Sequence, residues 1–154
     1  MTFNKYKNKT KLSGVWNINR VEKYLRETVY PLRFSYIAPN NFPVVVSLWF
    51  VYQNKLLWCA VQKDSAVARN LKENPNCAFE IGPNEPPYMG VRGQGKAVLI
   101  PQKGGQKLKI LLKKYLNDSN ESLAKWLLSR TESEVAICIE PICIYSWDYR
   151  NRMK

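Results

Sequence analysis

The fold is decided by three segments: FPVVVSLWFVY (residues 42–52), SAVARNLKENP (65–75) and PYMGVRGQGKAVL (87–99). The first is continuously apolar and β-branched at its start, which predicts a strand that is buried on both faces. At the start of the second, Asp64 and Ser65 both offer an oxygen that can cap a helix, and the Asn-Pro pair ends that helix. The glycines of the third predict a bulge or a close backbone approach inside a long strand.

Further strands and helices are predicted on both sides of these segments. We expect helices over Arg20–Val29, Gln106–Leu116 and Ser122–Ser129, and strands over Leu32–Ala38, Leu56–Val61, Cys77–Ile81, Glu134–Glu140 and Ile142–Trp147. Asn19 is the expected cap of the first helix, and residues 1–14 are expected to be a basic, weakly ordered lead-in. Pro141 is expected to break the last two strands apart. The pattern predicts a mainly β fold, a barrel of about six antiparallel strands with peripheral helices, in a single domain over residues 1–154.

The composition excludes several classes of function. The chain has 154 residues and no histidine, which removes Ser-His-Asp and Cys-His catalysis and histidine-ligated zinc, iron or haem. Its net charge of +12 favours phosphate-bearing ligands, nucleic acid or acidic surfaces. A compositional bias toward lysine on a solvated surface explains the charge equally well.

The cysteines and the apolar runs predict a cytoplasmic location. Cys59, Cys77, Cys138 and Cys143 form no Cys-x-x-Cys pair, so we expect reduced, buried thiols and neither a disulfide framework nor a metal site. The longest apolar run, residues 43–52, is too short to span a bilayer, and the N-terminus lacks the apolar core of a signal peptide. We therefore expect no membrane contact.

The start of the 65–75 helix is the strongest candidate for a binding site. A helix that begins directly after a strand offers unpaired backbone N–H groups and a partial positive charge to a phosphate. Ser65 can donate its hydroxyl there, and Lys63, Arg69 and Lys72 add charge nearby. The alternative is a capped connector helix without a ligand, and the residues alone favour that alternative slightly.

Other charged and aromatic features are interpreted as structural. The helix over residues 106–116 has leucines on one stripe and lysines, Lys107 among them, on the opposite face. No aromatic residue interleaves with these lysines, so nucleic acid is not an expected partner. Trp49, Trp58 and Trp126 are expected in the core.

The order and spacing of these segments resemble the FMN-binding split-barrel family typified by pyridoxamine 5′-phosphate oxidase. The resemblance covers about residues 21–147. It is carried by the strand-turn-strand unit, the 65–75 helix, Val91–Ala97, and Ile139-Glu-Pro141 ahead of Trp147. It implies a six-stranded antiparallel split β-barrel that forms a homodimer with FMN sites at the interface between subunits.

The family's cofactor motifs are only partly present. The strand segment that lines the flavin falls on Val45–Phe50, the Tyr-Thr pair on Ala60-Val61, and the phosphate-binding Ser-Arg-Lys on Ser65-Ala66-Val67, while a flavin-contacting glutamine falls on Gly90. The serine is therefore kept and both cations are lost. The resemblance implies cofactor contacts from Val45, Val46, Ser47, Leu48, Trp49, Ala60, Val61, Lys63, Ser65 and Arg69, with Arg92 as a further candidate. Backbone groups of residues 46–49 and 60–61 would line the ring, and Ser65, Lys63 and Arg69 would meet the phosphate.

The function implied by the resemblance is flavin-dependent electron transfer. The histidine and arginine cluster that binds substrate in the oxidase has no counterpart here, so the chain looks more like a short flavin- or deazaflavin-dependent reductase acting on a small or nicotinamide-type substrate. Hydride transfer belongs to the cofactor and needs no histidine, and no catalytic residue is predicted. Two alternatives stay open: a deazaflavin as the cofactor, or no cofactor and a role as a basic binding module.

Overall fold

One mainly antiparallel sheet forms the centre of the computed structural model, which describes residues 9–154. Its strands are β1 (Lys11–Gly14), β2 (Leu32–Ile37), β3 (Pro43–Leu48), β4 (Val51–Gln53), β5 (Leu56–Gln62), β6 (Asn76–Ile81), β7 (Met89–Ile100) and β8 (Glu134–Asp148). They lie in the order β3-β2-β6-β7-β8-β5-β4, and β1 pairs in parallel with the C-terminal part of β8. The helices are α1 (Ile18–Glu27), α2 (Ala66–Glu73), α3 (Gly104–Tyr115) and α4 (Glu121–Leu128), with short 3-10 turns η2 (Pro101–Lys103) and η3 (Thr131–Ser133).

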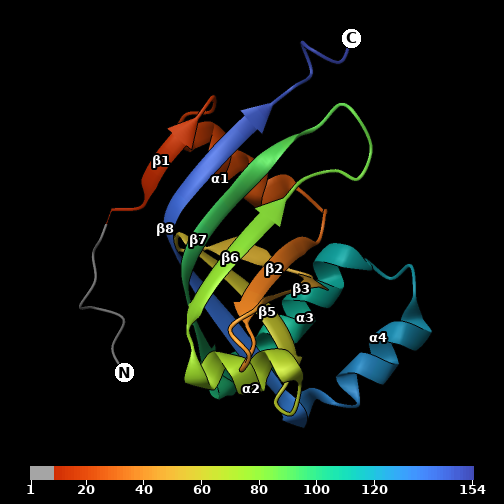
Figure 1. The fold of residues 1–154 in the computed structure, drawn as a ribbon. Helices are drawn as coiled ribbons and strands as arrows, with labels where there is room; N and C mark the ends of the chain where they lie inside the picture. Colours follow the sequence, from red (N-terminus) through yellow and green to blue (C-terminus); the bar gives the residue numbers. More distant parts are fainter. Residues whose placement is uncertain (1–8) are drawn as a thin grey trace.

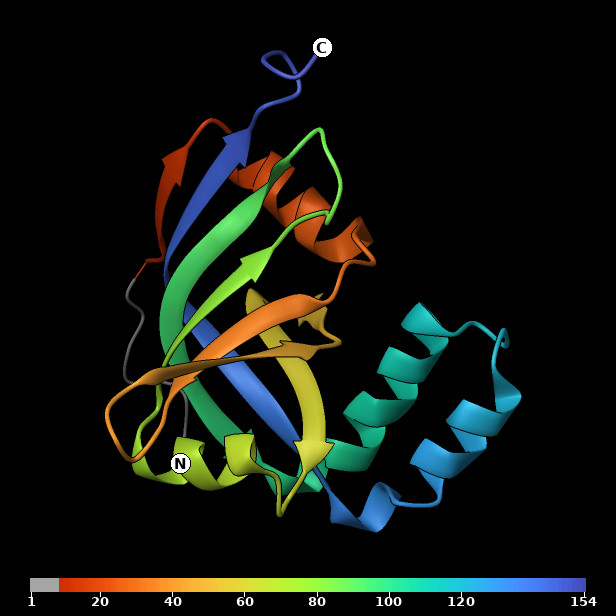
Figure 2. The same ribbon diagram turned by 45° about the vertical axis from the view of Figure 1, so that its right-hand side comes forward.

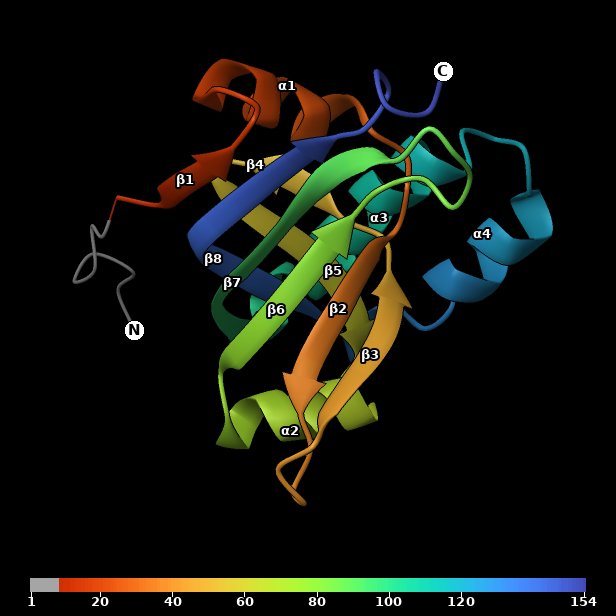
Figure 3. The same ribbon diagram turned by 45° about the horizontal axis from the view of Figure 1, so that its top comes forward.

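The sheet curls into a half-barrel around the core (Figure 1). Figure 2 shows β3 passing over β5, with α3 and α4 to one side, and Figure 3 shows α1 and α2 at opposite ends of the sheet. On β2 the apolar residues Leu32, Phe34 and Tyr36 are buried, and the residues between them are turned away from the core. Because the sheet is concave, its inner face forms one apolar core, and the predicted mainly β barrel with peripheral helices is confirmed.

A second, smaller apolar cluster lies on the outside of the sheet, beneath α3. Trp58 and Cys138 from the sheet and Leu111 from α3 are buried in it. The rest of the outer face, formed by β2, β3, β6 and the adjoining parts of β7 and β8, has no helix of residues 9–154 over it and faces the viewer in Figure 1. This uncovered face carries both charged and apolar side chains, Arg33, Glu80 and Arg92 beside Val45 and Tyr145.

The prediction of one strand over residues 44–52, buried on both faces, is wrong. The chain leaves the strand at Trp49-Phe50, so that β3 and β4 are separate. β3 lies at one edge of the sheet, where only its inward residues are covered, and Val45 on its outer side is 65% exposed. An apolar run therefore indicates burial on two faces only if something covers the second face, and nothing in residues 9–154 covers this one.

The sheet has eight strands where about six were predicted, and one predicted strand break is absent. Residues 11–14 of the expected lead-in form β1, and residues 1–8 lie outside the described part. Pro141 does not interrupt β8, because a bulge sets Gln94 opposite Cys143 and Gly95 opposite Pro141. The glycines predict a bulge or a close backbone approach in the 87–99 strand. The close approach is found at Gly95, where a Cβ would lie 2.4 Å from the Glu140 carbonyl oxygen, and the extra residue of the bulge beside it is Ile142 on β8.

Helix details correct three further expectations. Asn17, and not Asn19, caps α1 by accepting a hydrogen bond from the Arg20 backbone N–H at 3.0 Å. Lys107 is buried and not solvated: its ammonium donates to Gln53 Oε1 at 2.6 Å and lies 4.2 Å from the Trp58 ring centroid. Trp126 is 54% exposed because α4 packs beside α3 and away from the sheet.

No helix in residues 9–154 combines the length and apolar character that crossing a membrane requires.

Candidate functional site

The predicted phosphate corner lies where β5 ends and α2 begins. Ser65 caps α2, and its Oγ accepts a hydrogen bond from the Ala68 backbone N–H at 3.2 Å. The Ser65 hydroxyl proton is thus left to donate elsewhere, and the first backbone N–H groups of the helix lack helical partners. α2 has no acidic residue in its first turn, so the partial positive charge at its start is not neutralised from within the helix.

Arg69 and Lys63 lie at this corner, and a third cation, Arg130, lines a cavity next to it. Arg69 folds back over the helix start, and its Nη1 donates to the Asp64 carbonyl oxygen. Lys63 is exposed on the loop, and its backbone N–H donates to Ser133 O at 2.8 Å. That bond brings the loop against η3, and together they enclose a shallow cavity of about 410 Å³, lined by Lys63, Ser129, Arg130, Glu132 and Ser133.

Arg130 is the cation that sequence reasoning missed. It lies 67 residues after Lys63 in the chain, and no motif marks it. Only the docking of η3 against the end of β5 brings it to the corner. Val67, where the family has a cation, is 6% exposed and packs in the core, so a lysine there could not reach a ligand. The corner therefore has a capping serine and can draw its positive charge from Lys63, Arg69 and Arg130.

A buried glutamate, Glu134, lies beside the corner and is hydrogen-bonded to the end of β5. Glu134 is buried at the start of β8 and accepts a hydrogen bond from Gln62 Nε2, while Gln62 Oε1 accepts one from the Ser133 hydroxyl at 2.5 Å. Burial raises the pKa of Glu134, and the hydrogen bond from Gln62 and the positive charge of Arg130 oppose that rise. This chain of contacts positions the loop that carries Lys63.

We expect Glu134→Gln to remove a pH-dependent loss of stability. A carboxyl group whose pKa is raised by folding stabilises the protein fully below its unfolded pKa of about 4.3, and this stability is lost as the pH rises through the folded pKa. The amide can still accept from Gln62, so the variant should match the parent at pH 4 and exceed it at pH 7. Urea unfolding of both proteins from pH 4 to 8 measures this difference, and parallel curves would contradict it.

The side chains of the seven residues predicted to lie along the flavin ring do not share one surface. Val46, Leu48 and Val61 pack against the inner core, and Trp49 and Ala60 pack against the cluster beneath α3. Val45 and Ser47 alternate with the inward residues of β3 and face outward. Of these residues, Val45 lines the larger of the two cavities described here.

That larger cavity is a groove of about 490 Å³ on the uncovered outer face of the sheet. The strand register places Ser47 opposite Arg33, Arg33 opposite Glu80, and Glu80 opposite Arg92. Arg92 is in turn opposite Tyr145 on β8, and its guanidinium carbon lies 4.6 Å from that ring's centroid. We call Arg33, Glu80 and Arg92 the charge row.

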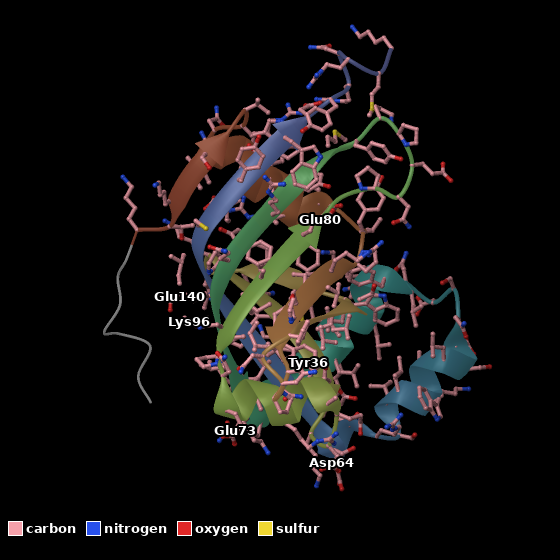
Figure 4. The ribbon with its side chains drawn as sticks, in the orientation of Figure 1. Tyr36, Asp64, Glu73, Glu80, Lys96 and Glu140 are labelled. Atoms are coloured by element: carbon pink, nitrogen blue, oxygen red, sulfur yellow. The ribbon has the colours of Figure 1, made fainter. Side chains whose placement is uncertain are left out.

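The groove and the phosphate corner are separate places on the molecule. In Figure 4, Glu80 lies toward the far end of β6, and Asp64 lies at the opposite end of the molecule, beside the start of α2. Arg92, a predicted candidate for the phosphate, therefore belongs to the groove. The sequence does carry a signal for the charge row, because each member sits between two buried or glycine positions of a strand, but only the register shows that the three are neighbours.

Comparison with known proteins shows the fold but no close relative. No family model and no curated protein matches the sequence. Among solved structures, the chain is similar to an F420 reductase (TM-score 0.68, 20% identity, covering 79% of this chain and 94% of that one). It is also similar to a conserved hypothetical protein from Mycobacterium tuberculosis (0.74, 17%, 94% and 92%) and to a Listeria innocua protein proposed to be a pyridoxamine 5′-phosphate oxidase (0.61, 16%, 84% and 94%). The split-barrel fold predicted from the resemblance is thus confirmed.

Proposed function

We propose that the chain is a flavin- or deazaflavin-binding oxidoreductase that acts as a homodimer. The observation that carries the proposal is the phosphate corner: a capped helix start with no acidic residue in its first turn, Arg69 folded over it, and Lys63 and Arg130 lining the adjoining cavity. Both kinds of cofactor bear a phosphate group, which such a helix start binds well. The fold shared with an F420 reductase and with a protein proposed to be a pyridoxamine 5′-phosphate oxidase supports the same assignment.

The residues of this chain would bind and orient the cofactor. Ser65 would donate its hydroxyl to the phosphate, Lys63 and Arg130 would supply charge, and Arg69 would do so from its place over the helix start. A bound flavin or deazaflavin supplies hydride transfer to or from a small or nicotinamide-type substrate. The chain without histidine would contribute position and electrostatics. Its four cysteines are unpaired, which fits a cytoplasmic location; Cys59, Cys77 and Cys138 are buried as predicted, whereas Cys143 is partly exposed.

A homodimer is supported by the uncovered outer face. The half-barrel leaves the edge strand β3 and the apolar side chain of Val45 exposed. Unpaired strand edges and exposed apolar groups are normally covered, and a second copy of the chain can cover both. Light scattering should give twice the 17.9 kDa mass of one chain at micromolar concentration. A single-chain mass would contradict the homodimer.

Arg69→Ala, Lys63→Ala and Ser65→Ala should weaken cofactor binding. Each charge-assisted hydrogen bond to phosphate contributes about 1.5–3 kcal/mol, so loss of the strongest should weaken binding by roughly ten- to a hundred-fold. We expect the largest effect from Arg69. Titration of each variant with FMN and with a deazaflavin, followed by fluorescence, measures the affinities.

Lys72→Ala is the matched control, because Lys72 lies in the last turn of the same helix, away from its start. It should bind as the parent does. If the three corner variants also bind like the parent, the phosphate is held elsewhere. A parent that binds neither cofactor would overturn the proposal and favour the cofactor-free binding module.

A further inference from the structure

The charge row on the uncovered face leaves its charges unpaired. Glu80 lies directly between Arg33 and Arg92 in the register of three hydrogen-bonded strands. Opposite charges at such positions have Cβ atoms about 4.5–5.5 Å apart and usually pair. Within residues 9–154, however, Glu80 accepts no side-chain hydrogen bond, and no basic nitrogen lies within 4.0 Å of its carboxylate.

The guanidinium groups of Arg33 and Arg92 differ in their hydrogen-bond partners. The Arg33 guanidinium donates to the Pro31 carbonyl oxygen at 3.1 Å and to Asn84 Oδ1 at 2.6 Å, so its own chain satisfies it. Arg92 lies over the Tyr145 ring, and no residue from 9 to 154 accepts a hydrogen bond from its guanidinium. Glu80 and Arg92 thus form a neighbouring acid and base that both face outward without a partner.

We infer that Glu80 and Arg92 recognise a second copy of the chain by pairing with Arg92 and Glu80 of the partner subunit. This inference rests on the proposed homodimer and identifies the contacts that would hold it. A two-fold axis that lies in the plane between the two faces and runs parallel to the strands, midway between β6 and β7, forms both pairs at once, because each subunit presents the acid and the base side by side. Arginine is suited to such pairs because its planar fork binds a carboxylate with two parallel hydrogen bonds.

The surroundings of the row favour a second copy over an anionic ligand. The carboxylate of Glu80 repels phosphate, whereas an identical face supplies the complementary charge at the same spacing. The next row along the groove has the short side chains Ser35 and Ala78 beside Gln94, which permits a second sheet to approach closely. The same contact would cover Val45 and Tyr145, which are exposed in the single chain.

Charge reversal followed by mixing tests the inference. Glu80→Arg and Arg92→Glu each place like charges across the axis twice, so each variant alone should dimerise at least roughly a hundred-fold more weakly than the parent. Mixed in equal amounts, the two variants carry complementary faces and should form a heterodimer with near-parental affinity. Sedimentation velocity on each variant and on the mixture measures the association. Mixing leaves contacts inside each chain unchanged, so recovery reports the interface alone.

Arg33→Glu is the matched control, since Arg33 is the other neighbour of Glu80 in the row. Because it keeps both Glu80 and Arg92, it should dimerise alone like the parent, and adding it to Glu80→Arg should not draw that variant into a heterodimer of near-parental affinity. The milder Glu80→Gln and Arg92→Gln preserve size; each should weaken the dimer roughly ten-fold, and the double variant less than the two effects combined. Reversed variants that dimerise alone, or a mixture that stays monomeric, would overturn the pairing while leaving the homodimer standing. A monomeric parent would overturn both, and cofactor titration of that parent would still test the phosphate corner separately.

Discussion

Phe34→Ala is expected to lower the free energy of unfolding by about 3–5 kcal/mol, the usual cost of truncating a fully buried phenylalanine. Phe34 lies at the middle of β2, between β3 and β6, and its side chain has no exposed surface. It is among the largest fully buried side chains of the core, so its removal leaves a cavity on the inner face of the sheet. Urea unfolding at a fixed chain concentration gives the free-energy difference.

The same substitution at an exposed position provides the control. Phe42 precedes β3 and is 69% exposed, and Phe42→Ala removes the same atoms without opening a cavity. We expect it to change the free energy of unfolding by no more than about 0.5 kcal/mol. Equal losses in the two variants would contradict the assignment of Phe34 to the core.

Gly104→Ala is expected to cost about 3 kcal/mol, because it overpacks a contact between two backbones. A Cβ on Gly104 would lie 2.0 Å from the Glu134 carbonyl oxygen and 2.8 Å from Val135 Cα. Neither atom belongs to a side chain that could move aside, so the start of α3 would have to shift away from β8. The melting temperature and the urea midpoint should both fall.

Gly105→Ala tests whether steric contact or helix propensity is responsible. The Cβ of this neighbouring residue would meet only the methyl group of Thr131, at 2.6 Å, and that side chain can rotate. Alanine is favoured over glycine in a helix by about 1 kcal/mol, so we expect little change or a small gain in stability. A gain from both substitutions would show that α3 does not approach β8 as described.

The sequence predicted those features that depend on neighbours along the chain. The cap at Ser65, the end of its helix and the bulge near Gly95 all follow from local chemistry, and the structure confirms them. Prediction from the sequence failed where the environment of a residue depends on segments distant in the chain. Val45 was expected to be buried on an apolar strand, and the edge position of β3 exposes it; Trp126 was expected in the core, and the position of α4 exposes it.

The candidate site shows the same division. Ser65 and the cations near it in sequence could be found from a strand followed by a capped helix. Arg130 could not, because η3 reaches the corner only through tertiary packing. The charge row required the registers of three strands, which no single stretch of sequence specifies. Predictions of function from this sequence are therefore strongest for local anion binding and weakest for surfaces assembled across strands.

The pairing of β1 with β8 has a consequence for synthesis on the ribosome. β1 is at the N-terminal end of the sheet, and its parallel partner is the last strand. The adjoining contact from Trp16 Nε1 to Asp148 Oδ2 joins residues that are 132 positions apart. Since translation proceeds from the N-terminus, β1 has no strand to pair with while the intervening chain emerges. The nascent chain must therefore keep this segment from pairing wrongly until β8 has been made, and closure of this edge of the sheet is a late event in folding.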